Sequence, residues 1–146
     1  MGKPKITPVE EDKFIRSPNV HGLVECNFYS FLNDKVAAMV MYYNPECPDC
    51  QRQRAHIIRA AKVTKRDNHA YAAVDCTKEK ALCKREGIVR LPTFMLYTRG
   101  QVLSNRSFPI DYIRMKEVME NIEAPPPLHP GRVPVDPDCP RIVVQK

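Results

Sequence analysis

The stretch that decides the fold is Val40-Met41-Tyr42-Tyr43-Asn44-Pro45-Glu46-Cys47-Pro48-Asp49-Cys50. It continues an apolar run from Val36, and such a near-continuous run is typical of a β-strand covered on both faces. Asn44-Pro45 ends this strand. Because proline is tolerated in the first turn of a helix, Pro48 predicts that a helix begins there. The two cysteines therefore lie between a buried strand and the first turn of a helix.

This placement gives the cysteine pair a chemistry. A thiol at a helix N-terminus faces unpaired N–H groups and the positive end of the helix dipole, which stabilise a thiolate. Cys50 lies one turn further on, close enough to form a disulfide with Cys47. A C-x-x-C pair is also half of a zinc site, but zinc needs a second pair of ligands. Cys76 and Cys83 belong to a different strand–helix junction and have no adjacent histidine, so the pattern favours a redox pair without metal or cofactor.

Strands and helices alternate along the rest of the chain. The apolar patterns predict strands at 20–24, 36–43, 70–74, 93–98 and 101–108, the last two forming a hairpin around Arg99-Gly100. Predicted helices run through Phe28, Phe31 and Leu32; from Pro48 with a buried stripe of Ala55, Ile58 and either Ala61 or Lys62; from a Thr77 cap to Gly87; and from an Asp111 cap through Met115, Val118, Met119 and Ile122. This order, β-α-β-α-β-α-β-β-α, predicts an α/β fold with a mixed sheet between helices.

Proline marks the predicted boundaries of the folded unit. The chain has 146 residues and 14 prolines, and half of these prolines lie after residue 124. We therefore expect a flexible lead-in over 1–12, one domain over 13–124, and a proline-rich linker or tail over 125–146. A chain of this length has room for one ordinary domain with a real core.

Composition excludes several classes of protein. With 43% hydrophobic and 27% charged residues, the composition is globular rather than disordered. No run approaches the roughly 20 apolar residues of a membrane span. The start has no apolar run of the kind that marks a secretory signal peptide, so we expect either a cytosolic protein or a piece whose targeting segment is missing. The net charge of +6 is spread along the chain, and its densest patch lacks interleaved aromatic residues, so we expect no nucleic-acid partner; that patch is Arg52, Arg54, Arg59, Lys62, Lys65 and Arg66.

The cysteine content favours an oxidising compartment. The chain has six cysteines, an even number with short spacings. Such a cysteine content is more typical of proteins of the secretory pathway than of cytosolic proteins. The sequon Asn105-Arg106-Ser107 is compatible with the same compartment and makes Asn105 a glycosylation candidate.

Three segments together resemble the protein disulfide isomerase family, whose domains have the thioredoxin fold. They are residues 40–50, then Val74-Asp75-Cys76-Thr77, then Val89-Arg90-Leu91-Pro92-Thr93-Phe94. The resemblance covers about residues 20–124. It implies that Cys47 attacks substrate disulfides, that Cys50 resolves them, and that Pro92 is a cis-proline beside the two sulfurs. It further implies that the backbone of Leu91 pairs with an extended substrate, and that the partners are cysteine-containing client proteins.

The sequence departs from this family at the cysteine pair. Glu46 stands where the family usually has tryptophan, Pro48-Asp49 replaces glycine-histidine, and Met41 occupies the position of a buried acid that accepts the proton of the resolving thiol. Negative charge at Glu46 and Asp49 opposes the Cys47 thiolate, which predicts a less oxidising disulfide, and the absent acid predicts a slower second step. A family arginine near the last helix has no clear match: the position falls near Ile110, and Arg114 is a substitute candidate.

The resemblance also bears on the other cysteines. Some family members look similar around Cys76 and Cys83, so we expect a structural disulfide between them, although two semi-buried free thiols are the alternative. The sequence does not decide the oxidation state of Cys26 and Cys139: either can be a free thiol, and Cys139 can form a disulfide with another chain. The leading hypothesis is a thiol–disulfide oxidoreductase domain of the endoplasmic reticulum lumen or secretory pathway, with neighbouring domains of a longer chain among its expected partners. The alternatives are a catalytically weak module for client binding or domain spacing, and a cytosolic redox sensor.

Overall fold

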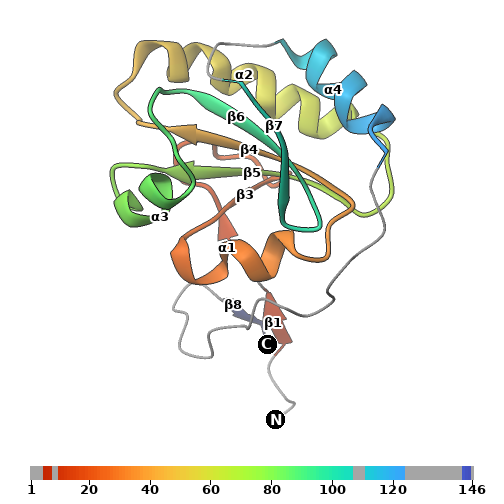
Figure 1. The fold of residues 1–146 in the computed structure, drawn as a ribbon, viewed down its shortest axis with the longest axis horizontal. Helices are drawn as coiled ribbons and strands as arrows, with labels where there is room; N and C mark the ends of the chain where they lie inside the picture. The colour runs from red at the N-terminus through yellow and green to blue at the C-terminus, as the bar shows by residue number, and fades with distance from the viewer. Residues whose placement is uncertain (1–4, 8–9, 107–110, 124–142, 146) are drawn as a thin grey trace.

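The computed structural model describes residues 5–7, 10–106, 111–123 and 143–145, and its main body is one mixed sheet between two layers of helices (Figure 1). The strand order in this six-stranded sheet is β2-β3-β5-β4-β6-β7. A separate two-stranded sheet pairs β1 (Lys5–Thr7) with β8 (Val143–Gln145) in antiparallel register. The α/β fold expected from the sequence is confirmed.

Strand β4 (Ala37–Tyr43) lies inside the sheet, and all seven of its residues are buried. It runs parallel to β5 (His69–Asp75) and antiparallel to β6 (Thr93–Thr98). β3 (Val20–Gly22) runs parallel to β5, while β2 (Glu10–Glu11) and β7 (Gln101–Arg106) pair antiparallel at the two ends of the strand order. The carboxyl ends of β3, β5 and β4 consequently meet at one edge of the sheet, where the cysteine pair follows β4.

The sheet separates the hydrophobic core into two clusters, and a different pair of helices covers each of them. On one face, α2 (Pro48–Val63) and α4 (Tyr112–Asn121) contribute Cys50, Ile57, Ala60, Met115 and Met119, packed against Met39, Met41 and Tyr43 of β4. On the other face, α1 (Glu25–Leu32) and α3 (Lys80–Arg85) contribute Phe28, Phe31, Leu32, Leu82 and Cys83. In Figure 1, α2 and α4 lie above the sheet, and α1 and α3 lie below it.

Two local predictions are wrong. Thr77 does not cap α3, because its backbone N–H and hydroxyl both donate to the Asp75 carboxylate (2.9 and 2.6 Å) and the helix begins only after Glu79. The buried stripe of α2 is also shifted: it consists of Cys50, Gln53, Ile57 and Ala60, whereas Ala55 is exposed. The Asp111 cap is confirmed, since its side chain accepts a hydrogen bond from the Arg114 N–H at 2.8 Å.

The predicted proline-rich tail lies almost entirely outside the described residues, as do Cys139 and Ile110. The division of the chain at residues 12 and 124 therefore stays a prediction. Asp12, the last residue of the predicted lead-in, is buried with 6% of its surface exposed.

Candidate active site

The end of β4 delivers Cys47 to the start of α2 through a tight turn. Asn44 organises this turn: its carbonyl accepts the Cys47 N–H at 3.0 Å and its side chain accepts the Glu46 N–H at 2.8 Å. Cys47 is the N-cap of α2, and Pro48 occupies the first turn, where a missing N–H costs nothing. The sulfur thus lies where helix N–H groups are unpaired.

Two contacts hold the Cys47 sulfur, which is only half-buried. The backbone N–H of Cys50 donates to Cys47 Sγ at 3.1 Å. The thiol in turn donates to the carbonyl oxygen of Leu91 at 3.6 Å, and the Leu91–Pro92 peptide bond is cis. The structure therefore brings together Cys47, Cys50, Leu91 and Pro92, four residues singled out from the sequence.

Cys50 differs from Cys47 in its surroundings. Its side chain is completely buried on the inner face of α2, and both cysteines carry free thiols. Burial raises the pKa of the Cys50 thiol to about 12, and the hydrogen bond between its side chain and Cys47 adds to the rise. One accessible sulfur and one buried, protonated sulfur suit a nucleophile and a resolving group.

Beneath the pair, the sheet supplies no acid from β4. Met41 is fully buried and belongs to the same core cluster as Cys50. Among the described residues, the buried carboxylate is that of Asp12, which lies on the segment before β3. Its oxygens accept the Tyr43 hydroxyl at 2.8 and 2.9 Å.

The acidic residues flanking Cys47 are placed differently from each other. Glu46 is exposed, whereas Asp49 forms an ion pair with Arg52 one turn further along α2. This ion pair offsets part of the negative charge that Asp49 was expected to place beside Cys47. Arg114, the substitute candidate for the family arginine, is exposed near the start of α4.

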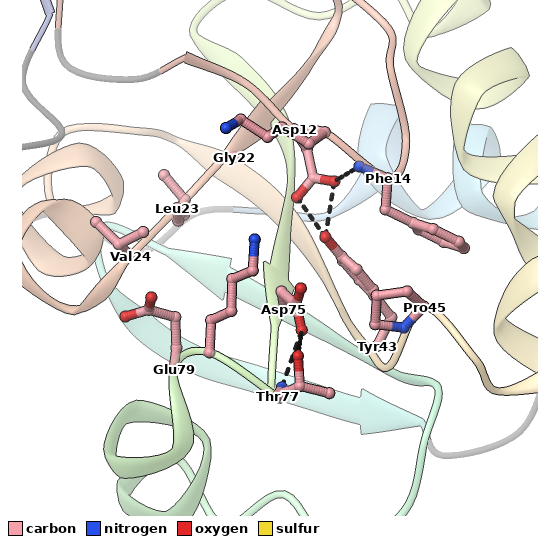
Figure 2. Close-up of a pocket in the computed structure, with 12 residues that line it drawn as sticks. Asp12, Phe14, Gly22, Leu23, Val24, Tyr43, Pro45, Asp75, Thr77 and Glu79 are labelled. Carbon is pink, nitrogen blue, oxygen red and sulfur yellow. Dashed lines mark hydrogen bonds between the residues drawn. The ribbon is translucent and has the colours of Figure 1, made fainter.

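A cavity of about 400 Å³ lies beside this site, at the carboxyl ends of β3, β4 and β5 (Figure 2). Tyr43 and Pro45, which precede Cys47, form part of its wall. The Phe14 ring stacks on the Tyr43 ring with centroids 4.6 Å apart. Across the cavity, Asp75 accepts the two hydrogen bonds from Thr77 (Figure 2). Sequence reading missed the Asp12–Tyr43 contact, because Asp12 stands among charged residues that look solvent-exposed.

The remaining candidates lie at a distance from the pair in the sequence. Cys76 and Cys83 form a disulfide with an S–S distance of 2.01 Å. Cys26 is half-buried in the first turn of α1 and is disulfide-bonded, so it is not the free thiol that the sequence left open. Asn105 lies on β7, opposite Met95. Within the described part of the chain, no group of three or more His, Cys, Asp or Glu residues is arranged to hold a metal ion, and no helix is long and apolar enough to cross a membrane.

The matching family profile is that of thioredoxin, and it covers residues 19–121. The chain belongs to the thioredoxin family. Its curated relatives are protein disulfide-isomerases: Protein disulfide-isomerase A5 of Mus musculus is 36% identical over 107 residues, which is 70% of this chain and 21% of the relative. The Bos taurus protein of the same name is 42% identical over 78 residues, 51% of this chain and 15% of the relative. The chain thus spans about a fifth or less of these relatives' length, and it is a thioredoxin-fold domain of the protein disulfide isomerase family.

Solved structures agree on the fold of this thioredoxin-family domain. A mutant thioredoxin from Halobacterium salinarum superposes with a TM-score of 0.62 at 21% identity, covering 71% of this chain and 91% of that chain. The zinc-bound form of human ERp44 superposes with a TM-score of 0.64 at 20% identity, covering 69% of this chain and 29% of that chain. At these identities the likeness establishes the fold alone.

Proposed function

We propose that this chain is a thiol–disulfide oxidoreductase domain of a protein disulfide isomerase-like protein. The observation that carries the proposal is the placement of Cys47: a half-exposed sulfur at the N-cap of α2, with the Cys50 N–H 3.1 Å away and the Leu91 carbonyl 3.6 Å away. The helix N-terminus stabilises a thiolate, and the thiolate is the nucleophile in disulfide exchange.

The reaction proceeds in two exchanges. The Cys47 thiolate attacks one sulfur of a client disulfide, which forms a mixed disulfide and releases the other client sulfur as a thiolate. Cys50 then loses its proton, and its thiolate attacks Cys47 Sγ. This second exchange releases the remaining client thiolate and leaves a Cys47–Cys50 disulfide in the domain. The backbone around Leu91, opposite Cys47, offers the edge on which an extended client segment pairs.

The proposed setting is the endoplasmic reticulum lumen or secretory pathway, with cysteine-containing proteins as clients and neighbouring domains in a longer chain. Its support is the Cys76–Cys83 disulfide, the cysteine content and the kinship with disulfide isomerases. The Asn105 sequon makes a glycan on this chain a marker of that compartment. The cytosolic alternative predicts an unmodified Asn105 when the natural gene product is isolated from its cell.

A trapping experiment tests the proposed chemistry. The Cys50→Ala variant is incubated with a client protein that contains a disulfide, and the products are separated on a non-reducing gel. We expect a mixed disulfide through Cys47 to accumulate, because the resolving thiol is absent. The matched Cys47→Ala variant keeps Cys50 but not the accessible sulfur, and it is expected to trap nothing. Equal trapping by the two variants contradicts the assignment of roles.

A second candidate function is a catalytically weak module that binds clients or spaces neighbouring domains. The observation that favours it is the burial of Cys50, whose thiol has a pKa raised to about 12, in a core cluster to which β4 contributes Met41 and no acid. In this case mixed disulfides form but turn over slowly. The rate of insulin disulfide reduction by the wild-type chain, compared with an efficient thioredoxin, distinguishes the two functions.

A further inference from the structure

The Cys76–Cys83 disulfide joins the carboxyl end of β5 to α3. Cys83 is 6% exposed and belongs to the core cluster on the α1 and α3 face, against which Cys76 also packs. Cys50 belongs to the cluster on the opposite face, and Cys47 packs against that cluster. The disulfide is therefore separate from the cysteine pair, but backbone hydrogen bonds connect both of its ends to segments that lead to the pair.

The first connection runs from Cys76 to the strand that carries Cys47. The backbone N–H of Cys76 donates to the carbonyl of Tyr43 at 2.9 Å. Tyr43 is the last residue of β4, and the turn from Asn44 onward leads directly to Cys47. The Cys76 end of the disulfide is thus hydrogen-bonded to the end of β4, from which the chain turns to Cys47.

The second connection runs from Cys83 to the cis-proline loop. The backbone N–H of Ile88 donates to the carbonyl of Cys83 at 2.9 Å, across a turn in which Gly87 has a φ of +75°. Ile88 and Leu91 pack against the cluster that contains Cys83, and Leu91 also packs against the cluster that contains Cys50. The carbonyl of Leu91 is the group that Cys47 contacts.

We propose that Cys76 and Cys83 are positioning residues for Cys47. Their disulfide fixes, relative to each other, the two backbone segments between which the sulfur lies: the end of β4 and the loop at Leu91. This inference rests on the proposed function, in which a client segment docks along Leu91 while Cys47 attacks it. Loss of the disulfide is then expected to weaken client binding, which raises KM, and to leave the chemical step almost unchanged.

The fold has other ties that keep α3 in place without the disulfide. The Glu86 carboxylate at the end of α3 accepts the Tyr97 hydroxyl at 2.8 Å and also the Tyr29 hydroxyl. Leu82 is completely buried in the same cluster. Removing the disulfide is therefore expected to loosen the loop over 86–91 rather than to unfold the domain.

The test compares the full chain with a Cys76→Ser/Cys83→Ala double variant. Three quantities are measured: kcat and KM for reduction of a peptide disulfide with glutathione as the thiol that returns the Cys47–Cys50 disulfide to thiols, the rate at which a small aromatic disulfide oxidises Cys47, and amide hydrogen exchange over residues 88–91. We expect KM to rise about three- to tenfold while kcat and the small-disulfide rate stay within about twofold. Amide exchange over 88–91 is expected to accelerate, because the loop opens more often.

The matched control is Thr64→Val. It removes the buried hydrogen bond of 2.7 Å between Thr64 and Tyr71 at the far end of α2, so it lowers stability without touching the loop. It is expected to leave KM and the exchange of residues 88–91 unchanged. A KM shift of the same size in Thr64→Val overturns the proposal, because general destabilisation then accounts for the effect.

The outcomes separate this inference from the proposed function. A folded double variant with unchanged KM and unchanged exchange shows that the disulfide only stabilises the domain, and overturns the positioning role. If the wild-type chain reduces no peptide disulfide, the proposed function fails, and exchange over 88–91 alone decides the positioning role. If the double variant does not fold, Cys76→Ala/Cys83→Val, which fills the half-buried and buried positions with apolar side chains, takes its place, and the same KM and exchange criteria decide the inference.

Discussion

The buried carboxylate of Asp12 accepts the hydroxyl hydrogen of Tyr43, with the two carboxylate oxygens 2.8 and 2.9 Å from the phenolic oxygen. The same carboxylate accepts the backbone N–H groups of Phe14 and Ile15 at 2.9 and 3.0 Å. Since Tyr43 is the last residue of β4, this cluster fastens the segment before β3 to the strand that ends at the cysteine pair. A buried carboxylate is costly unless it is fully hydrogen-bonded, and here each contact reduces that cost.

We therefore expect Tyr43→Phe to lower the free energy of unfolding by about 1–3 kcal/mol, because it leaves Asp12 buried with fewer donors. Urea denaturation measures the change. Asp34→Asn is the control: the Asp34 side chain is 77% exposed and forms an ion pair with Lys35, so the loss of its charge is expected to change stability by less than about 0.5 kcal/mol. A Tyr43→Phe variant as stable as Asp34→Asn contradicts the argument.

Most of the fold follows from the sequence because local signals agree there. The buried run ending at Tyr43 predicts a central strand, Pro48 predicts the start of α2, and Asp111 predicts the start of α4. Leu91 and Pro92 are different: no periodicity indicates a cis peptide bond or a contact with Cys47. They are placed only through the resemblance to a family.

The misses have physical reasons. Asp12 looks exposed beside Glu10 and Glu11, and its burial depends on Tyr43, a partner 31 residues away. Thr77 looks like a helix cap, but its backbone N–H and hydroxyl donate to the Asp75 carboxylate, and α3 begins after Glu79 instead. The buried face of α2 is hard to recognise from the apolar pattern because it includes a polar residue, Gln53, between Cys50 and Ile57. Local sequence patterns do not predict contacts between residues far apart in the chain, nor the burial of polar side chains.

The charge at Glu46 predicts a redox property of the pair. An exposed carboxylate next to Cys47 opposes the thiolate, and a disulfide is less oxidising when its reduced form is less stabilised. We expect a reduction potential nearer to that of thioredoxin, about −270 mV, than to that of protein disulfide isomerase, about −180 mV. Equilibration in glutathione buffers measures this potential.

The Glu46→Gln variant is expected to be more oxidising than the wild type by about 5–20 mV, the shift that an exposed charge worth a few tenths of a kcal/mol produces. Glu117→Gln, which removes an exposed charge on α4, serves as the control and is expected to change nothing. A wild-type potential as oxidising as that of the isomerase shows the charge argument to be wrong.

Burial of Cys50 predicts the pH dependence of the second exchange. In the mixed disulfide Cys47 is no longer a thiol, but burial, the main cause of the raised pKa of Cys50, remains, and only the thiolate attacks. Below that pKa the thiolate fraction grows about tenfold per pH unit, so release of a mixed disulfide is expected to accelerate steadily between about pH 6.5 and 9.5 without a plateau. Quenched-flow measurement of release from Cys47 records this profile. A plateau near pH 7 to 8 shows that Cys50 ionises far more easily than its burial implies.

The last prediction concerns Met41, which packs in the core cluster of Cys50 and which the family resemblance aligns with a buried acid. Without a base, the proton of Cys50 has to leave a buried site for solvent, and general-base assistance is typically worth about 10² to 10⁴ in rate. Met41→Glu is therefore expected to accelerate mixed-disulfide release at pH 7, to introduce a plateau into its pH profile, and to leave formation of the mixed disulfide nearly unchanged. Met41→Gln has nearly the same shape without a basic group, and Met39→Glu places the same carboxylate two residues earlier on the same face of β4, so neither is expected to accelerate release. If the wild type already turns over insulin disulfides like an efficient thioredoxin and the glutamate adds nothing, then the acid is dispensable in this domain. The weak-module function then loses its main support, because Cys50 releases mixed disulfides efficiently without an acid at position 41.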